Sequence, residues 1–540
     1  MTGSGTIEGH DRARAAWWRP KVGASAEFGD RLAAPAAFVI TGVSIGLLAA
    51  DQGGYFPGSW RLATLFYATV VVAILAGARE LRVPRTALVT VAGLAGLCAW
   101  TAASWLWSDD RTATVSDAHL VLVYVAGGAA LVLLANGGRG VAVAGGVVAA
   151  AAAVDCFSMV SRLYPRTFGM YNTGGGYGRL YQPIGYWNGL GAFSVMAIIL
   201  GLGFAARGGM LTRMLAAAAL IPLSTTLYLT FSRGALVGLA AGLVALVALD
   251  KSRVQLIVAA AAGSIGAAGA LLAVHAHGAL TKYNRELGEQ TVQGAQTAAR
   301  MISLVPLAMG AAALLAGLEA RFTVSRFART LAGAGMVLAA CAAVAVGVNR
   351  FGNPVGLVHD AIHTFEKPAP TFPKGDLNLR LLSLSPNGRV VFWKTAWHDF
   401  TAHPAVGSGG GTFARYWAVH RPVKISVRNA HSLYLETLAE LGVVGLAIAL
   451  VALIPPLFAG LRRRSHPFSA PVMAAYIAFL VHTGGDWTWQ LPGVAMAAIA
   501  CAAACLGLEA DPGGVRLGKP ARAAGIAVAL AIAAVGAWGA

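Results

Sequence analysis

The feature that most constrains this chain of 540 residues is a succession of apolar stretches, most of them long enough to cross a bilayer as an α-helix. Hydrophobic residues make up 57% of the sequence and charged residues only 12%, which excludes an ordinary soluble protein. We therefore expect an all-α, polytopic integral membrane protein with about 13–15 transmembrane helices. The predicted spans are residues 33–50, 62–78, 86–107, 118–135, 140–160, 187–206, 214–231, 234–250, 254–274, 301–318, 331–348, 433–460, 470–483, 491–508 and 523–540.

Basic residues indicate how these helices are oriented. If the N-terminus is cytoplasmic, the tail and the short inner loops contain 22 Lys and Arg residues, whereas the outer segments other than the longest loop contain 9. Short cytoplasmic loops are enriched in Lys and Arg, so this asymmetry favours a cytoplasmic N-terminus. We expect a cytoplasmic tail at 1–32, helices 1–11 within 33–348, a large extracytoplasmic loop at 349–432 and helices 12–15 within 433–540.

The net charge of +18 raises the question of a nucleic-acid partner. The Lys and Arg residues are dispersed between apolar runs, which is typical of membrane anchoring instead. The five cysteines fall in or beside apolar runs and show neither metal-ligand spacing nor a disulfide framework. We therefore expect membrane lipids around the protein, no nucleic-acid partner, no metal site and no cofactor.

The sequence Asn429-Ala-His-Ser-Leu-Tyr places a histidine at the end of the long loop, immediately before an apolar span. His431 is thereby predicted at the outer mouth of a transmembrane helix, where a base can act on a substrate at the membrane surface. The alternative is that His431 and Ser432 only cap the helix.

Arginines are predicted on the same side of the membrane. Arg233 opens the eighth span, where the helix dipole disfavours a cation, and this suggests a function such as bidentate binding of phosphate. An interfacial anchor is the alternative. Arg179 and Arg389 lie in outer segments, where they are either ligands of the same kind or ordinary loop arginines.

Other outer groups allow two interpretations each. The run containing Gly407, Gly409 and Gly411 offers backbone N–H groups to an anion or forms a plain turn. Asp486, which lies between aromatic residues, either orients a base or only hydrogen-bonds its loop. Long-loop residues at helical spacing predict an amphipathic helix with Val390, Trp393, Trp397 and Phe400 on one face. Three further acidic residues have no assigned role. Asp109 and Asp110 are expected in a solvated loop, and Asp155 lies inside a predicted span.

Several short motifs over residues 100–500 resemble, in the same order, those of the O-antigen ligase and polymerase superfamily of bacterial envelope glycosyltransferases. No single motif is decisive, whereas their order is specific. The chain departs from the family pattern in having more predicted helices than is usual. The motifs are Trp107-Ser108, Gly178-Arg-Leu with the Gly185/Asn188 turn, Ser232-Arg-Gly-Ala235, Gly388-Arg389 with Trp393, His403-Pro with Gly407-x-Gly409-x-Gly411, Asn429-Ala-His-Ser-x-Tyr-Leu, and Asp486-Trp487 with Leu491-Pro492.

The resemblance implies a C-type glycosyltransferase fold with one large outer loop, located in the bacterial cytoplasmic membrane. It implies a polyprenyl-pyrophosphate-linked glycan as donor and a lipid, a glycan or a protein as acceptor. Carried over motif by motif, the family's essential arginines fall on Arg179 and Arg233, and its loop histidine falls on His431.

A pyrophosphate departs as an anion, so such a site must hold it and deprotonate the acceptor hydroxyl. Two arginines suit the first task and a neutral histidine suits the second. Direct attack inverts the anomeric carbon, and we expect a metal-independent, inverting glycosyltransferase.

Two other classes of protein are compatible with a polytopic chain. A transporter of bicarbonate or of a lipid-linked glycan places polar groups at mid-membrane, often in repeated halves. Here the ionisable residues gather at the predicted outer surface, Asp155 excepted, and no repeated halves are evident. A structural scaffold has no need of arginines near a histidine. Within the enzyme class, ligation of finished glycan and polymerisation of repeat units both remain open.

Overall fold

The computed structural model describes residues 28–168, 178–282, 286–321, 376–381, 388–511 and 513–538. Within these ranges the chain is almost entirely helical. The longer helices are α2 (Phe28–Ala50), α3 (Pro57–Gly77), α4 (Arg85–Ala103), α5 (Arg111–Ala135), α6 (Gly140–Leu163), α8 (Trp187–Arg207), α9 (Met210–Leu229), α10 (Arg233–Leu249), α11 (Arg253–Gly263), α12 (Ile265–His275), α14 (Leu287–Arg321), α18 (Arg389–Ala402), α20 (Leu433–Leu453), α22 (Ser469–Thr483), α23 (Pro492–Leu506) and α24 (Lys519–Trp538).

Shorter elements connect these helices. They are α7 (Pro165–Phe168), α13 (Gly278–Thr281), α17 (Asn378–Leu381), α19 (Phe413–His420), α21 (Pro455–Arg462), the 3₁₀ turns η2 (Gln52–Gly54), η3 (Ser104–Leu106) and η4 (Thr488–Gln490), and two strands of two residues each, β1 (Arg82–Val83) and β2 (Val515–Arg516).

The prediction of a polytopic all-α membrane protein is confirmed. Among the described residues, ten helices are long and apolar enough to cross a membrane, and α11 with α12 forms one more span if its 47° bend is accepted. Three shorter apolar helices, α10, α22 and α23, also lie within the bundle. Fourteen of the fifteen predicted spans thus correspond to helices. The predicted span at 331–348 lies outside the described residues.

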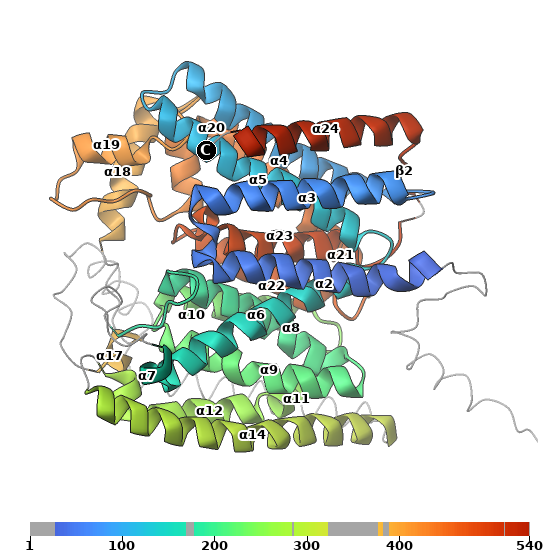
Figure 1. The fold of residues 1–540 in the computed structure, drawn as a ribbon, viewed down its shortest axis with the longest axis vertical. Coiled ribbons are helices and arrows are strands. Elements are labelled where there is room, and N and C mark those ends of the chain that lie inside the picture. Colours follow the sequence, from blue (N-terminus) through green and yellow to red (C-terminus); the bar gives the residue numbers. More distant parts are fainter. Residues whose placement is uncertain are drawn as a thin grey trace, which may run out of the picture.

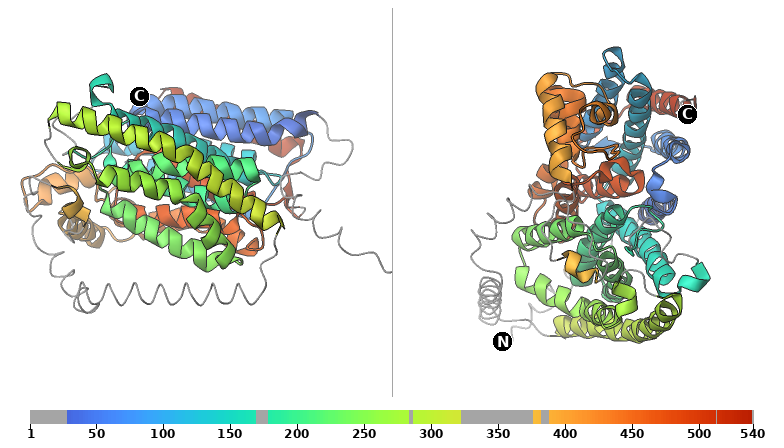
Figure 2. Two further views of the ribbon diagram at one scale, coloured as in Figure 1. Left: turned by 90° about the horizontal axis from the view of Figure 1, so that it is seen from below. Right: turned by 90° about the vertical axis from the view of Figure 1, so that its left-hand side faces the viewer.

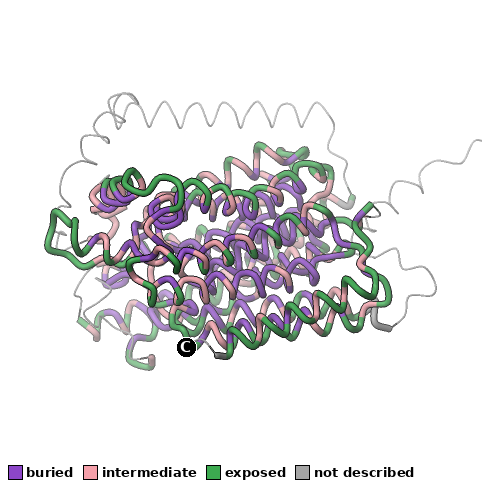
Figure 3. The backbone as a smooth tube through the Cα atoms, turned by 90° about the horizontal axis from the view of Figure 1, so that it is seen from above, coloured by how far each residue is buried: buried purple, intermediate pink, exposed green. Residues whose placement is uncertain are grey.

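The helices run side by side, with α8 at the centre of its half of the bundle (Figure 1). All residues of α8 from Asn188 to Ala206 are buried, and α8 packs against α6, α9, α10, α11 and α22. A helix that is apolar on every side is suited to such a position. Helices α14 and α24 lie at the periphery and leave most of their surface exposed, so buried backbone concentrates in the middle of the bundle (Figure 3).

The two ends of the bundle differ in character. At one end β1 pairs antiparallel with β2, Arg82 opposite Arg516, and the amide of Gly140 donates to the carbonyl of Gly507 at 2.8 Å. These are loops that the sequence predicts to be cytoplasmic. Helices α17, α18 and α19 of the long loop lie at the opposite end (Figures 1 and 2). Loops that the sequence predicts on opposite sides of the membrane thus lie at opposite ends of the bundle.

The helix predicted in the long loop is present as α18, but a different face of it is buried. Phe392 and Ala396 pack with Phe413 and Trp417 of α19. Trp397, which lies on the predicted apolar face, is 53% exposed. The reason is that α18 packs against α20 and α19 through Phe392, Thr395, Ala396 and Asp399, a set that the spacing of its tryptophans does not reveal.

Helix α20 is broken within its span. Gly442 has φ +66°, and a Cβ there would lie 2.3 Å from the carbonyl oxygen of Ala405. The long loop fills the break, because the amides of Val443 and Val444 donate to the carbonyls of Pro404 and Ala405 at 3.0 and 3.3 Å. Backbone groups at membrane depth need partners inside the protein, and the loop supplies them.

Candidate active site

Five segments that are far apart in the sequence meet at the end of the bundle that carries α17–α19. They are the loop before α8, the first residues of α10, the first residues of α18, the turn before α20 and the loop between α22 and α23. Each segment contributes a polar side chain at or near a helix end. The polar groups of the site are therefore held by rigid helices.

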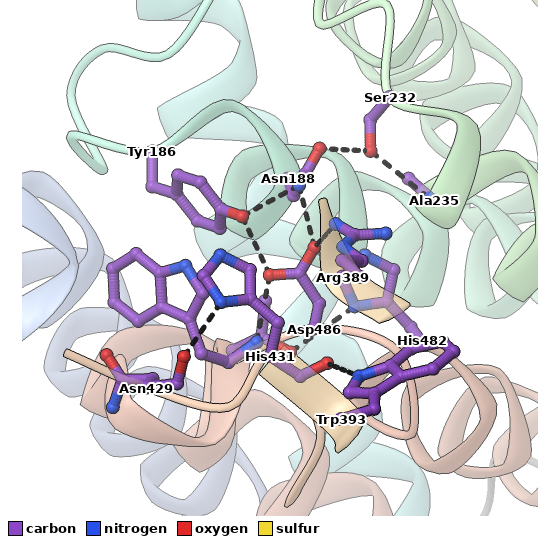
Figure 4. A network of polar contacts seen from close by, with 12 residues as sticks. Tyr186, Asn188, Ser232, Ala235, Arg389, Trp393, Asn429, His431, His482 and Asp486 are labelled. Carbon is purple, nitrogen blue, oxygen red and sulfur yellow. Dashed lines mark hydrogen bonds and ion pairs between the residues drawn. The ribbon is translucent and has the colours of Figure 1, made fainter. Parts of the chain in front are cut away.

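Asp486 lies at the centre of the resulting network (Figure 4). Its carboxylate accepts hydrogen bonds from the hydroxyl of Tyr186 at 2.8 Å and from Nδ2 of Asn188 at 2.7 Å. It also forms an ion pair with Nη2 of Arg389 at 2.5 Å. Burial raises the pKa of the Asp486 carboxyl, but the charges of Arg389 and of the two nearby histidines, with the hydrogen bond from Tyr186, together outweigh burial, and the pKa is lowered from its ordinary value. Asp486 is thus an ionised, fully bonded carboxylate.

The predicted arginine Arg179 is buried behind this carboxylate. Its Nε donates to the carbonyl of Thr230 at 2.7 Å, its Nη2 donates to Oδ1 of Asn188 at 3.1 Å, and its guanidinium lies 4.4 Å from the ring centre of Trp187. Burial lowers the pKa of Arg179 well below its ordinary value, and the charge of Arg380 lowers it further. Much of its hydrogen-bonding capacity is therefore used in positioning Asn188 and the start of α10.

Arg233 and Arg389 are half-buried instead. Arg233 is the first residue of α10, whose N-cap Ser232 also donates to Oδ1 of Asn188 at 2.7 Å. The adjacent Gly234 lies against Arg389, since a Cβ on that glycine would be 4.0 Å from Nη1 of the arginine. The start of α10 and the start of α18 therefore face each other across one site.

Arg380 on α17 is a fourth arginine of this group. Burial lowers its pKa, and the charge of Arg389 adds to the effect. Arg179, Arg233, Arg380 and Arg389 are thus close enough to repel one another, with Asp486 among them. Such an arrangement is ready to receive an anion.

His431 stands in a turn whose geometry determines its tautomer. Its Nδ1 lies 3.0 Å from the carbonyl oxygen of Asn429, which accepts but does not donate, so Nδ1 carries the proton. In the neutral ring Nε2 then holds a lone pair, and no described residue hydrogen-bonds to it. Ser432 caps α20, with its hydroxyl accepting from the amide of Leu435 at 3.4 Å. The capping function therefore belongs to Ser432, and the ring of His431 is left for another function.

The backbone of His431 is strained. Its φ of +57° lies in the left-handed region, as does that of Phe231 at +46°. Each of these residues comes directly before an N-cap serine, so the chain turns sharply into α20 and into α10. Non-glycine residues held in this region gather at functional sites; here His431 is itself the predicted base, and Phe231 lies two residues before the predicted anion ligand Arg233.

The electrostatics keep His431 neutral. Burial lowers the pKa of its ring, Asp486 opposes this and Arg389 reinforces it, and the net pKa is lowered from 6.5. The ring lies 6.4 Å from that of Trp487 and 5.3 Å from that of Phe392, between centroids. An imidazole in this environment is deprotonated at neutral pH and available as a base.

The glycine run does not face the arginines. The amides of Gly407, Gly409 and Gly411 donate within the protein, to the carbonyl of His403 at 3.0 Å, to the carbonyl of Glu440 at 2.8 Å and to the carboxylate of Glu440 at 3.0 Å. Their positive φ values permit this close approach to α20. These N–H groups fix the loop and are not directed at a ligand.

The remaining predicted acids lie outside the network. Asp109 is exposed, and Asp110 caps α5 by accepting from the amide of Ala113 at 3.0 Å, which agrees with a loop at the surface. Asp155 is fully buried in α6, and its two carboxylate oxygens have no hydrogen-bond partner among the described residues.

Sequence reasoning did not assign roles to Tyr186, Asn188, His482 or Arg380. Tyr186 and Asn188 stand in the turn that the motifs pointed to, and their position at the start of α8 was the available signal. His482 lies next to Asp486 in Figure 4, and its Nδ1 is 3.3 Å from Oγ1 of Thr488. Arg380 lies in the long loop without any motif around it, so nothing in the sequence singled it out.

Part of the chain matches a family of known proteins. A family model described as O-Antigen ligase matches residues 291–450, a range that contains Arg389 and His431 but neither Arg179 nor Arg233. No curated protein shows a significant match to the chain. Members of the matched family are ligases or polymerases that transfer glycosyl groups. Over residues 291–450 the chain is therefore similar to the O-antigen ligase family, which supports the resemblance to the O-antigen ligase/polymerase superfamily.

Proposed function

We propose that the protein transfers or polymerises glycan from a polyprenyl-pyrophosphate-linked donor at the outer face of the bacterial cytoplasmic membrane. One observation carries the proposal. Four arginines, Arg179, Arg233, Arg380 and Arg389, lie close enough to affect one another, Arg389 is paired with Asp486, and His431 with an unprotonated Nε2 lies near that carboxylate. The cationic group suits a leaving pyrophosphate, and the histidine suits an acceptor hydroxyl.

Pyrophosphate binding is assigned to arginines with different roles. Arg233 and Arg389 are half-buried at helix starts, and their guanidinium groups provide planar, bidentate contacts to phosphate oxygens. Arg179 contributes positive charge from its buried position and holds Asn188 in place. Asp486 keeps Arg389 oriented without cancelling the charge of the whole group.

His431 acts as the general base in this proposal. Nε2 takes the proton of the acceptor hydroxyl while that oxygen attacks the anomeric carbon, and the glycosyl–pyrophosphate bond breaks with inversion. The hydrogen bond from Nδ1 to the carbonyl of Asn429 stabilises the imidazolium that forms. No step in this sequence calls on a metal ion, and we propose a metal-independent reaction.

The two ends of the bundle support a proposed orientation in the membrane. The site lies at the end opposite β1 and β2, whose loops are rich in arginine. Because basic loops favour the cytoplasm, we place the site outside and the N-terminus inside.

The test compares Arg233→Lys, Arg233→Ala and His431→Ala in proteoliposomes. We expect both Arg233 variants to lose binding of a radiolabelled polyprenyl pyrophosphate, since lysine keeps the charge but not the bidentate fork. His431→Ala should bind this probe normally while transfer slows by roughly 10²–10⁴-fold.

Matched controls lie on exposed surfaces at the same end of the bundle. Arg111→Lys and His420→Ala should leave both probe binding and transfer unchanged, because Arg111 stacks on Trp105 and His420 on Tyr416, away from Asp486. Near-normal transfer by Arg233→Lys would make that residue a membrane anchor. Near-normal transfer by His431→Ala would leave the protein without its proposed base.

A further inference from the structure

A second polar site lies beside the arginine site, within the bundle. A cavity of about 40 Å³ opens between α4, α5, α20 and the loop that follows Asp486. Its lining includes the carboxylates of Asp117, Glu436 and Glu440 and the rings of Trp487 and Trp489. The proposed reaction with pyrophosphate and base uses none of these carboxylates.

Two of the carboxylates are held in place by neutral donors. Glu436 accepts from Nδ2 of Asn429 at 3.1 Å, from the amide of Ala430 at 2.7 Å and from Nε2 of Gln490 at 3.1 Å. Glu440 accepts from two backbone amides of the loop at 3.0 Å each. Within the described part of the chain, no three His, Cys, Asp or Glu side chains are placed to hold a metal ion. The carboxylates therefore form a rigid acceptor surface that is not arranged as a metal site.

An unpaired hydroxyl also lines the cavity. Thr101 on α4 is 0% exposed, and its Oγ1 has no hydrogen-bond partner among the described residues. A buried hydroxyl without a partner costs free energy unless a ligand or water supplies one. The cavity thus combines hydrogen-bond acceptors with a group that itself lacks a partner.

The cavity is connected to the proposed base on one side. Glu436 binds the two residues that precede His431, so the cavity wall and the His431 turn share one hydrogen-bond network. The ring of Trp487 lies 6.4 Å from that of His431 and 4.5 Å from that of Tyr186, between centroids, and it also lines the cavity. Trp487 therefore separates the carboxylates from the arginine group.

We propose that this cavity is the acceptor subsite and that it binds hydroxyl groups on one edge of an uncharged sugar. The proposal rests on the function proposed above, in which a nucleophile and a pyrophosphate occupy opposite sides of the anomeric carbon. Carboxyl oxygens accept hydrogen bonds from sugar hydroxyls, and indole rings pack against the apolar face of a sugar. A volume of about 40 Å³ holds a few water-sized groups, so it takes the polar edge of the ring and not the whole ring.

The experiment measures sugar binding directly, without transfer. Saturation-transfer-difference NMR is recorded on the purified protein in detergent with methyl glycosides of glucose, galactose, mannose and glucuronic acid. We expect at least one neutral glycoside to bind, and the glucuronide to bind at least tenfold more weakly because the cavity is acidic. Asp117→Asn, which keeps the shape but removes the charge, should weaken the neutral glycoside by roughly 10–100-fold, and Thr101→Val by roughly 2–10-fold.

Controls separate this proposal from the proposed function. Ser116→Ala changes a polar neighbour of Asp117 that does not line the cavity, and it should bind the glycoside like the wild type. Arg233→Ala should also bind it normally, because the arginine site is separate. Equal binding by the wild type and Asp117→Asn, preferential binding of the glucuronide, or no binding of any neutral glycoside would overturn the acceptor subsite. Loss of pyrophosphate binding in Arg233→Ala would still support the donor site.

Discussion

Replacing Asp486 by asparagine tests the centre of the site most directly. The substitution keeps the size of the side chain, removes the ion pair with Arg389 and puts an amide donor where four donors now converge, from Tyr186, Asn188, Arg389 and the amide of Trp487. Breaking a buried ion pair from one side costs about 3–5 kcal/mol. Arg389 is 19% exposed, so we take the lower value, about 3 kcal/mol. If the transition state bears this whole cost, kcat/KM for glycan transfer falls by about 10²-fold, at about 1.4 kcal/mol per tenfold.

The assay is kcat/KM for glycan transfer in proteoliposomes, recorded against pH, together with thermal unfolding in detergent. Asp486 raises the pKa of His431, so its neutralisation should lower that pKa and move the acidic limb of the pH profile to lower pH. Asp399→Asn is the control, since Asp399 is also fully buried at this end but pairs with His403 and Ser408. It should lower stability without moving the limb.

A double-mutant cycle with Arg389→Gln isolates the pair itself. If the ion pair is the cause, the double variant should lose little more than either single variant, because each has already broken the same contact. The reasoning would be refuted if the losses of kcat/KM in the two single variants simply add in the double variant. It would also be refuted if Asp486→Asn lowered kcat/KM by less than threefold and left the acidic limb unchanged.

Three further predictions follow from the structure. The acidic limb of transfer by the wild type should have its midpoint below pH 6.5, because the pKa of His431 is lowered from 6.5 and the base acts when deprotonated; a midpoint above 6.5 would contradict this. In a variant without the five native cysteines, a cysteine at position 401 should react with an impermeant maleimide in intact cells and one at position 464 should not, whereas the reverse pattern would place the site in the cytoplasm. Transfer should persist in EDTA, and a loss that magnesium or manganese restores would assign a metal to the reaction.

The apolar spans were predictable because they depend on local composition alone. What the sequence could not show is where a span is interrupted. Residues 254–274 read as one helix, but the chain bends by 47° between α11 and α12. Residues 433–460 also read as one helix, yet Gly442 breaks α20 because a distant loop supplies the missing backbone partners. Interruptions of this kind are set by tertiary contacts, which apolarity does not encode.

The sequence predicted which residues form the candidate site better than it predicted what each residue does there. Motif order pointed to Arg179, Arg233 and His431, and the structure brings all three to one end of the bundle. Sequence patterns did not distinguish the buried Arg179, with two of its donors committed, from the half-buried Arg233. Burial is decided by the neighbouring helices, and Arg380 joins the site only because α17 folds back onto it.

The insertion of the long loop into the break of α20 limits how such proteins can be recombined. Residues 404–409 are joined through their backbones to residues 439–444, so the two segments form one structural unit although a chimera would normally cut between them. Exchanging the loop alone between homologous proteins would leave the amides of Val443 and Val444 without their hydrogen-bond partners within the membrane. A graft that alters acceptor choice should therefore take the loop and the first half of α20 together, with its boundary after Val444.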